Sequence, residues 1–356
     1  MNLFFDARYI RTDFHDGISR YTTELGNALA RLTPITFIVS DMAQLKHLPP
    51  SSKHILLHSV TSPKEPFTSM ILNKYHPDVV ISPLQTMGSV GRRFKLILTL
   101  HDLTYYKHRT PPIQYNRALR IGWRMYHMSY IPQRLALNGA DVIATVSDTV
   151  KGEILDANLT KRPVIVVSNA ARDLSHYLGT TPYIVNKPKN LVYMGAFLPY
   201  KNVETLIRAM EFLPGRTLHL LSRISPERKS QLRKIIPEHA DVIFHGGISD
   251  QEYAEILAND SVMVSASKAE GYGLPLAEAL TLGVPAVVTN MKIFKEVGGE
   301  GALYADPDEP QNFAARIAEL DDKELRDKLI AKGKKHIQKF NWDHSAHILL
   351  DAIKKL

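Results

Sequence analysis

Residues 270–280, EGYGLPLAEAL, place two carboxylates eight positions apart around a glycine-rich entry to an apolar helix. We expect the helix to begin near Pro275, because a first-turn residue needs no partner for an N–H group. The backbone amides at a helix start carry roughly half a positive charge and form a site for phosphate. Carboxylates bind hydroxyls rather than phosphate, so Glu270 and Glu278 indicate a ligand with hydroxyls on both sides of a phosphate. A nucleotide sugar has that arrangement.

Each carboxylate taken alone has a simpler interpretation. Glu278 would then only complement the helix dipole, and Glu270 would be a solvated acid on the preceding loop. The two acids together, with Gly-Tyr-Gly-Leu-Pro between them, favour the ligand interpretation.

The elements that would position these acids are strands and helices that alternate along the chain. The predicted strands are residues 2–6, 35–40, 78–82, 95–100, 141–147 and 164–168 in the first half, and 190–195, 217–222, 241–246, 261–266 and 285–290 in the second. They are continuous apolar runs, as parallel strands covered on both faces require. Strand–helix alternation of this kind predicts two doubly wound α/β domains.

The length of 356 residues suits two domains. A polar stretch rich in Pro, Gly and Thr follows Asn169 and predicts the boundary. We expect an N-terminal domain over residues 1–175 and a C-terminal domain over residues 185–341. The final helical pattern, residues 342–356, is expected to pack back on the first domain.

Ligands of open parallel sheets bind beyond the carboxyl ends of the strands. The residues just after the predicted strands are therefore the first candidates for a site. They are Asp6, His101, Asp102, Ser147, Asn169, Gly195, Ser222, Arg223, His245, Gly246 and Glu270.

Composition excludes several classes of protein. The chain has no cysteine, so neither disulfides nor thiolate metal sites are possible. No apolar run reaches 18 residues, and the N-terminal residues lack the apolar core and cleavage site of a secretory signal. No nucleic-acid-binding module is recognisable. A cytoplasmic protein is expected.

The excess of positive over negative charge lies in the first half of the chain. Residues 1–180 hold 21 Lys and Arg against 13 Asp and Glu, which accounts for the whole net charge of +8. An anionic partner of the N-terminal domain would explain this asymmetry, and so would a solvated basic face.

Residues 115–137 are rich in arginine and aromatic side chains at helical spacing. In one interpretation they form a membrane-surface element that meets anionic lipid and a lipid-linked acceptor, which would make the protein peripheral at the inner face of the membrane. In the other, they form an ordinary amphipathic helix with a basic outer stripe.

EGYGLPLAEAL is similar to the E-x7-E signature of the retaining glycosyltransferases of family 4, the group 1 glycosyl- and mannosyltransferases. Other segments resemble the same family in the same order: GISRYTTEL (17–25), LTLHDLTYY (98–106), ATVSD (144–148), YMGAFLPYKN (193–202), IFHGGISDQEYAEILA (243–258) and LGVPAVVTN (282–290). The resemblance covers about four-fifths of the chain. It implies the GT-B fold, in which two Rossmann-like domains face each other across a cleft.

The resemblance also implies roles for individual residues. Glu270 would accept hydrogen bonds from the 3- and 4-hydroxyls of the donor hexose, and Glu278 from the ribose hydroxyls. Lys201 would neutralise the diphosphate, which suits an ammonium group. Gly17 would let a glycine-rich first loop approach the donor phosphate. His101 would contact the transferred sugar near its 6-position.

The remaining implied contacts are made mostly by backbone. The amides of Gly271, Tyr272, Gly273 and Leu274 would hold the sugar and phosphates. Gly195, in the segment that opens the second domain, would also lie in the donor site. The backbone around Phe244 and His245 would meet the edge of the nucleobase. No metal and no other cofactor is implied.

The chain departs from the family pattern at two places. Many members have an arginine where this chain has Ala196 or Tyr200, so a second phosphate-binding cation is missing, and Arg223 or Arg20 is the candidate to replace it. The family's Asn-Gly after the last strand of the first domain is Asn169-Ala170 here, which weakens a ligand role for Asn169.

Two other candidates have structural alternatives. His101 and Asp102 could form a satisfied buried pair, and Ser147 could be a helix N-cap instead of a ligand contact.

The expected activity is retaining transfer of a hexose, with mannose and glucose first, from a GDP- or UDP-sugar to a glycan or lipid-linked acceptor in cell-envelope or polysaccharide assembly. A catalytically silent nucleotide-sugar-binding module and a GT-B epimerase are the alternatives. A dehydrogenase is disfavoured, because no G-x-G-x-x-G follows the first strand.

Overall fold

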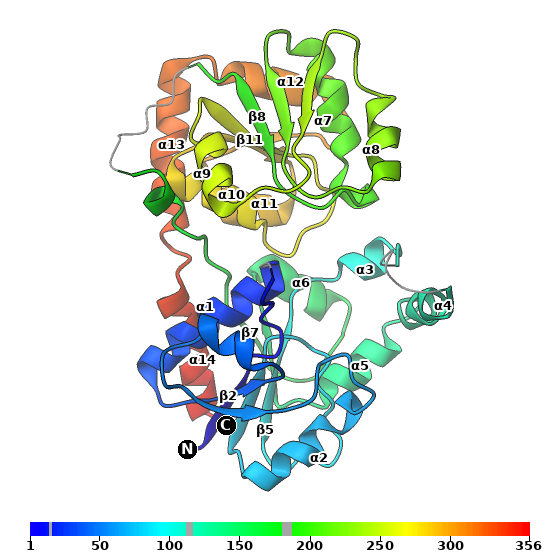
Figure 1. Ribbon diagram of the computed structural model, residues 1–356, viewed down its shortest axis with the longest axis vertical. Coiled ribbons are helices and arrows are strands. Elements are labelled where there is room, and N and C mark those ends of the chain that lie inside the picture. The colour runs from blue at the N-terminus through cyan, green and yellow to red at the C-terminus, as the bar shows by residue number, and fades with distance from the viewer. Residues whose placement is uncertain (14–15, 112–116, 180–186) are drawn as a thin grey trace. The chain divides into compact units, whose positions relative to one another are not determined.

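The computed structural model describes residues 1–13, 16–111, 117–179 and 187–356. The chain divides into two compact units, one formed by residues 1–169 and 340–356 and the other by residues 170–339 (Figure 1). Part of the predicted boundary, residues 180–186, and the first two residues of the 115–137 segment lie outside the described residues.

The first unit is built on a parallel sheet of seven strands in the order β3-β2-β1-β4-β5-β6-β7. The strands are β1 Leu3–Asp6, β2 Thr36–Val39, β3 Lys53–Leu56, β4 Val79–Ser82, β5 Lys95–Leu100, β6 Val142–Thr145 and β7 Val164–Val166. Its helices are α1 Gly17–Leu32, α2 Thr68–Leu72, α3 Thr104–Lys107, α4 Arg117–Tyr126, α5 Ile131–Asn138, α6 Asp148–Asp156 and α14 Trp342–Lys354, with 3-10 turns at Met42–His47, Glu65–Phe67 and Asn73–Tyr75. The strand order reverses between β1 and β4.

The second unit has a parallel sheet of six strands in the order β10-β9-β8-β11-β12-β13. The strands are β8 Asn190–Tyr193, β9 Thr217–Leu220, β10 Asp241–Phe244, β11 Ser261–Ser265, β12 Ala286–Thr289 and β13 Leu303–Ala305. Its helices are α7 Val203–Ala209, α8 Pro226–Arg233, α9 Asp250–Leu257, α10 Leu274–Leu282, α11 Lys292–Gly298, α12 Pro310–Glu319 and α13 Lys323–Ile337, with 3-10 turns at Ser175–Tyr177, Pro199–Lys201 and Met210–Phe212. Here the order reverses between β8 and β11.

The predicted fold class is confirmed, since every apolar run named above contains a parallel strand. The prediction missed β3 and β13. Both are short strands at sheet edges, and β3 is largely exposed. The exposed side chains of β3 and the three-residue length of β13 leave neither with the continuous apolar run that marks a covered parallel strand, whereas the other two edge strands, β7 and β10, have such runs.

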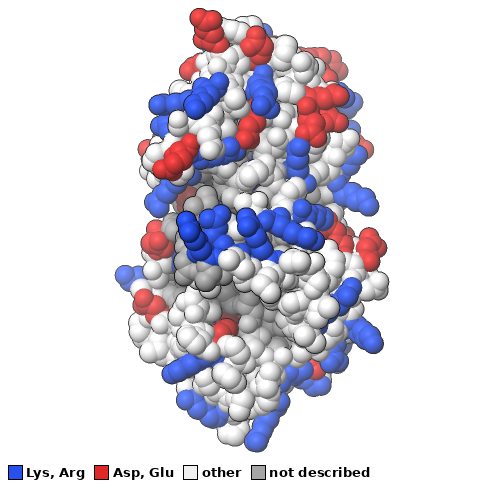
Figure 2. Space-filling model, turned by 90° about the vertical axis from the view of Figure 1, so that its right-hand side faces the viewer, with Lys and Arg blue, Asp and Glu red and all other residues white. Residues whose placement is uncertain are grey.

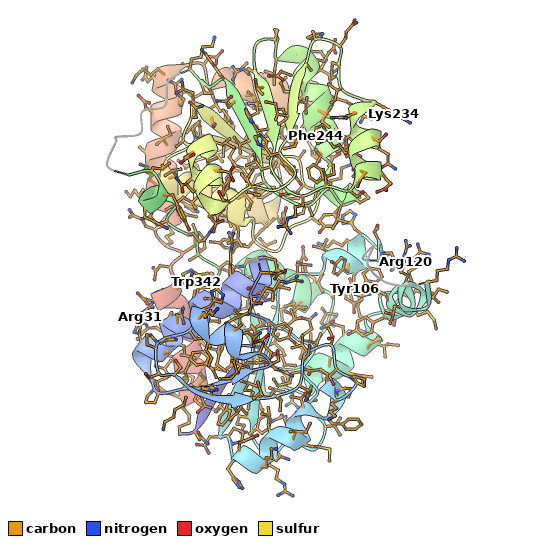
Figure 3. All side chains as sticks on the ribbon, in the orientation of Figure 1. Arg31, Tyr106, Arg120, Lys234, Phe244 and Trp342 are labelled. Atoms are coloured by element: carbon orange, nitrogen blue, oxygen red, sulfur yellow. The ribbon has the colours of Figure 1, made fainter. Side chains whose placement is uncertain are left out.

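The last helix, α14, belongs to the first unit and packs against α1. Trp342 meets the ring of Tyr21 edge-to-face, with centroids 5.8 Å apart, and Figure 3 shows it beside α1. The Ser345 hydroxyl donates to the Ser168 carbonyl, 2.8 Å away. Arg31 and Asp343 form an ion pair on the surface of the same contact.

A buried ionic network lies after β1 in the first unit. The Arg8 guanidinium makes two hydrogen bonds to the Asp6 carboxylate and two to that of Glu65, all between 2.8 and 3.0 Å. The side chains of Arg8 and Asp6 are fully buried. Because a buried charge is tolerated only when it is paired and hydrogen-bonded, this network fixes the loop at the carboxyl end of β1.

Among the described residues, no helix combines the length and apolarity needed to cross a membrane.

Candidate functional site

Lys201 and Glu270 meet at the point where the strand order of the second unit reverses. Lys201 follows β8 and Glu270 follows β11, and these neighbouring strands run in parallel. The Nζ atom of Lys201 lies 2.6 Å from Oε1 of Glu270, and both side chains are less than a fifth exposed. A switch point of this kind is where open α/β sheets bind ligands. The structure thus brings together a cation suited to bind phosphate, Lys201, and a carboxylate suited to accept hydrogen bonds from hydroxyls, Glu270. The sequence predicted these two roles from positions 69 residues apart.

The backbone of the two loops holds this pair in place. The Lys268 N–H, just before Glu270, donates to the Tyr200 carbonyl, just before Lys201, over 2.8 Å. The Tyr193 hydroxyl donates to the Ala196 carbonyl at 2.7 Å. On the outer side of the β8 loop, Arg228 of α8 donates to the Phe197 carbonyl. These bonds fix the conformation of the two loops.

Gly195 lies at the start of the β8 loop, where its N–H donates to the Ser222 hydroxyl at 3.1 Å. A Cβ on Gly195 would come within 2.8 Å of the Tyr193 hydroxyl oxygen. A larger residue there would therefore displace the tyrosine that anchors the loop.

The entry to α10 is a left-handed turn. Gly273 caps the helix with φ of 99°, and a Cβ there would come within 2.8 Å of the Phe294 ring. Glycine is thus required both for the backbone conformation and for the contact with Phe294. Pro275 lies in the first turn, as predicted. The amides of Gly271, Tyr272 and Leu274 belong to this same turn, and the ring of Tyr272 is buried.

Glu278 lies one turn into α10 and is only 2% exposed. Its Oε1 accepts a hydrogen bond of 2.9 Å from Nε of Arg172, whose Nη1 lies 2.6 Å from Asp250 at the start of α9. Burial alone would lower the pKa of Arg172, but the carboxylates of Glu278 and Asp250 outweigh it and raise that pKa. The guanidinium therefore stays charged and holds the Glu278 carboxylate in one orientation.

Arg172 is a residue that the sequence did not single out. It lies in the polar stretch assigned to the domain boundary, 106 residues before Glu278. Its position three residues after Asn169, at the end of a predicted strand, was the only feature of the sequence that could have marked it as a site residue. Spacing alone does not pair an arginine with a carboxylate so far along the chain.

The ends of β9 and β10 carry a second group of predicted residues. Phe244 ends β10, with the Lys229 ammonium 5.4 Å from its ring centroid, and His245 follows it (Figure 3). The His245 amide donates to the Leu220 carbonyl, and its Nε2 lies 3.0 Å from Nδ1 of His219. One of these nitrogens must donate and the other accept, so this contact fixes the ring of His245.

Arg223 is exposed at the same edge of the sheet. A Cβ on Gly247 would come within 2.7 Å of its Cγ, so the arginine stem lies over that glycine. Arg223 thus follows β9, next to the strand that precedes Lys201. Of the two proposed replacements for the missing cation, it is the one in this unit. Arg20 lies on α1 of the first unit.

His101 follows β5 in the first unit, and its ring is held on two sides. Its Nε2 lies 2.7 Å from the Pro83 carbonyl, and its ring meets Tyr21 edge-to-face at 4.8 Å. A carbonyl can only accept, so Nε2 carries the proton and Nδ1 of the neutral ring is an acceptor. Burial lowers the pKa of His101 below its ordinary value of 6.5. Asp102 accepts a hydrogen bond from the Thr104 amide, and its negative charge only partly offsets the effect of burial on the pKa of His101.

The predicted glycine-rich loop at residues 17–25 is wrong in its conformation, since Gly17 is already the first residue of α1. Asp16 caps this helix by accepting from the Ser19 amide. The cap starts the helix at the residue after it, so Gly17 lies at an exposed helix N-terminus instead of within a loop.

Ser147 and Asn169, two further candidate site residues, both lie in the first unit. Ser147 is fully buried and is the N-cap of α6, accepting from the Val150 amide, which is the alternative considered for it. Asn169 ends the N-terminal part of the first unit and is 5% exposed, and no described residue pairs with its Oδ1.

Comparison with known proteins supports this geometry. Residues 182–336 match the family model described as glycosyl transferases group 1, and residues 15–172 match the one described as glycosyltransferase family 4. O-antigen chain mannosyltransferase B of Escherichia coli is 26% identical over 279 residues, which cover 74% of this chain and 71% of that protein.

Solved structures show the same fold at low sequence identity. The sucrose-phosphate synthase of Thermosynechococcus elongatus superposes with a TM-score of 0.75 at 19% identity, covering 99% of this chain and 98% of that one. Anabaena Alr3699/HepE, solved in complex with UDP and glucose, has a TM-score of 0.72 at 17% identity over the full length of both chains. Two parallel-sheet domains of this kind make the GT-B fold. Both units match models of one enzyme family, and the chain belongs to the family 4, group 1 glycosyltransferases.

Proposed function

We propose that this glycosyltransferase moves a hexose, mannose or glucose, from a GDP- or UDP-sugar to a glycan or lipid-linked acceptor in cell-envelope polysaccharide assembly, with retention of configuration. The pairing of Lys201 with Glu270 at the switch point of the second unit is the observation that carries the proposal. The E. coli relative named as an O-antigen mannosyltransferase and the neighbour solved with UDP and glucose support the choice of donor and pathway.

The ion pair is the resting state of the site in this proposal. In the ion pair, Lys201 and Glu270 neutralise each other. A bound donor divides them, because its diphosphate is the stronger partner for the ammonium group and its hexose hydroxyls donate to the carboxylate. Each side chain thus exchanges one charged partner for a group of the substrate, and neither is left buried and unpaired.

Lys201 and the amides at the start of α10 would stabilise the leaving diphosphate by fixed positive potential. The bond from the anomeric carbon to the diphosphate oxygen breaks, and its electron pair goes to the diphosphate. The acceptor hydroxyl oxygen bonds to the same carbon on the same face. Its proton passes to the departing phosphate oxygen, so no separate protein nucleophile or metal is required.

The other groups position the donor. Glu278, oriented by Arg172, would accept hydrogen bonds from the ribose hydroxyls. The backbone around Phe244 and His245 would contact the edge of the nucleobase. Arg223 would act as the second phosphate cation. In the first unit, Nδ1 of neutral His101 would accept a hydrogen bond from the 6-hydroxyl of the transferred sugar. Gly17 would contact the donor phosphate. We place this activity in the cytoplasm, at the inner face of the membrane.

A transfer assay tests the proposal directly. The protein is incubated with radiolabelled GDP-mannose, UDP-glucose and their relatives, with and without a chelator of divalent metals, and free sugar, nucleotide and lipid-linked product are separated. We expect one donor to be consumed, chelation to have no effect, and the product to keep the anomeric configuration of the donor. Binding of a donor without any hydrolysis or transfer would favour the silent nucleotide-sugar-binding module instead.

A further inference from the structure

We propose that the surface formed by α4, the α4–α5 connection and α5 of the first unit binds a bilayer that contains anionic lipid. This surface, here called the α4–α5 face, consists of Arg117, Arg120, Arg124, Ile121, Met125, Met128, Ile131 and Leu135. The proposal extends the proposed function by naming where a lipid-linked acceptor would be met.

Aliphatic side chains on this face are exposed to an unusual degree. Ile121 and Met125, one turn apart on α4, are 60% and 66% exposed. Met128 is 67% exposed, and Ile131 and Leu135, one turn apart on α5, are 60% and 72% exposed. Single exposed apolar residues need no explanation, but a series on consecutive elements marks an interaction surface.

Helix α4 packs on the unit through its aromatic side. The Trp123 ring lies 5.1 Å from that of Tyr105 and 4.0 Å from that of His127. Tyr106 in turn contacts His127 and Tyr130, with centroids 4.9 and 4.6 Å apart. The helix therefore uses large aromatic rings for its attachment and leaves the aliphatic side chains facing away.

The basic side chains of α4 lie next to the exposed aliphatic ones. Arg117, Arg120 and Arg124 recur at three- and four-residue spacing, so they share one side of the helix, and Ile121 and Met125 follow round the same surface. Figure 2 shows Lys and Arg side chains gathered side by side here, next to surface without charge. Figure 3 places Arg120 at the outer edge of the unit.

No acidic residue balances this charge locally. The 38 residues from Leu103 to Ala140 contain no Asp or Glu. Within the described chain no carboxylate forms an ion pair with the three α4 arginines. The nearby bases are used otherwise, since Lys107 pairs with Glu153 and Arg134 donates to carbonyls at the end of α6.

Charge and apolarity together identify a membrane as the partner. A soluble anionic ligand would account for the arginines but leave the exposed Ile, Met and Leu side chains unexplained. An apolar protein surface would account for those side chains but gain nothing from three arginines that form no ion pair with a carboxylate of the described residues. An anionic bilayer accounts for both features. The aliphatic side chains insert at the boundary between headgroups and acyl chains, and the arginines bind the anionic headgroups. This favours the membrane interpretation of residues 115–137 over that of an ordinary helix with only a basic outer stripe.

The test is co-sedimentation of the full chain with vesicles of phosphatidylcholine, with or without about one quarter phosphatidylglycerol, at low and high salt. We expect binding only to the anionic vesicles, weakened by salt. The triple variant Arg117→Gln, Arg120→Gln, Arg124→Gln should bind about a hundredfold more weakly, since each basic side chain near such a surface contributes about fivefold. Ile121→Glu with Met125→Glu should abolish binding.

Matched controls separate this face from net charge. Lys53→Gln, Lys64→Gln, Arg93→Gln removes three exposed bases of the same unit, and Met42→Glu places an acid at another exposed methionine, 53% exposed. Both controls should bind nearly as well as the unchanged protein. Equal loss in control and α4 variants, no sedimentation of the unchanged protein, or a dimer broken by Met125→Glu in place of vesicle binding would each overturn the proposal.

Folding and donor binding are followed in the same samples by thermal unfolding with and without nucleotide sugar. We expect the α4 variants to keep the stabilisation by donor. Vesicle binding and donor binding can fail separately, so failure of the membrane proposal is distinguishable from failure of the proposed transferase activity.

Discussion

The Lys201 ammonium group lies 2.6 Å from the Glu270 carboxylate, so two residues proposed to bind opposite parts of a donor are paired with each other. The pair is less than a fifth exposed. A donor that binds here must replace this contact. Substitution of either side chain should therefore affect both the stability of the protein and its affinity for the donor.

Removal of the carboxylate should separate these two effects. Glu270→Gln keeps the size of the side chain and a hydrogen-bond acceptor for Lys201 but loses its charge. We expect the free energy of unfolding to change by only about 1 kcal/mol, because the amide oxygen still accepts a hydrogen bond from the Lys201 ammonium group. Sugar transfer should fall by a factor of roughly a hundred or more, since charged acceptors bind hydroxyls more strongly. Steady-state kinetics and urea unfolding of one preparation measure both, and unchanged kcat/KM would contradict the assignment.

Arg172 is expected to act as a positioning residue for Glu278. Arg172→Lys keeps the charge but cannot reach both Glu278 and Asp250 with a planar fork. We expect KM for the donor to rise about tenfold while kcat changes little, because ribose is far from the bond that breaks. The preference for a nucleotide over its 2′-deoxy analogue should also shrink. A purely structural role would leave that preference unchanged and lower the melting temperature only.

His101 predicts a pH dependence of stability. Its pKa in the folded protein is below the ordinary 6.5, so between these two values the unfolded chain binds more protons than the folded one. The stability contribution is complete above pH 6.5 and is lost as the pH falls toward the folded pKa. In His101→Gln the free energy of unfolding, measured by urea from about pH 8 to about pH 5, should depend less on pH in that window. An equally steep profile in the variant would rule out His101 as the cause.

The buried network around Arg8 should dominate the stability of the first unit. Arg8→Ala leaves the carboxylates of Asp6 and Glu65 buried without their cation. Breaking a buried pair in this way costs about 3–5 kcal/mol. Lys323→Ala, which breaks an exposed i,i+4 pair with Asp327, is the control and should cost less than about 0.5 kcal/mol. Urea denaturation of both variants measures the difference, and similar losses would contradict the account of the network.

The central parts of both sheets could be predicted from sequence, because a strand covered on both faces must be apolar throughout. The strands β3 and β13 could not, because most side chains of β3 are exposed and β13 has only three residues. For Ser147, local rules offered the helix N-cap as one of two alternatives, and the structure forms that cap. The conformation of Gly17 was not predicted, because Asp16 starts the helix earlier than the resemblance implied.

The chemistry of the site was predictable where it depends on local sequence. Glu270, the left-handed Gly273 and Pro275 lie within one short segment whose turn and helix start follow from residue type. The partner of Glu278 depends instead on a contact across 106 residues. Likewise, the exposure of Ile121 and Met125 could not be inferred from their spacing. An apolar stripe usually faces the core, and here Trp123 takes that place.

The most direct test of the donor site is thermal unfolding of the unchanged protein and of Lys201→Ala with a panel of GDP- and UDP-sugars. A ligand that binds only the folded state raises the melting temperature, by roughly 3–8 °C at about a hundred times its dissociation constant. We predict that one nucleotide sugar stabilises the unchanged protein and that the variant, with a similar melting temperature alone, loses this shift. An equal shift in the variant, or no shift with any member of the panel, would contradict the assignment of Lys201 to the donor diphosphate.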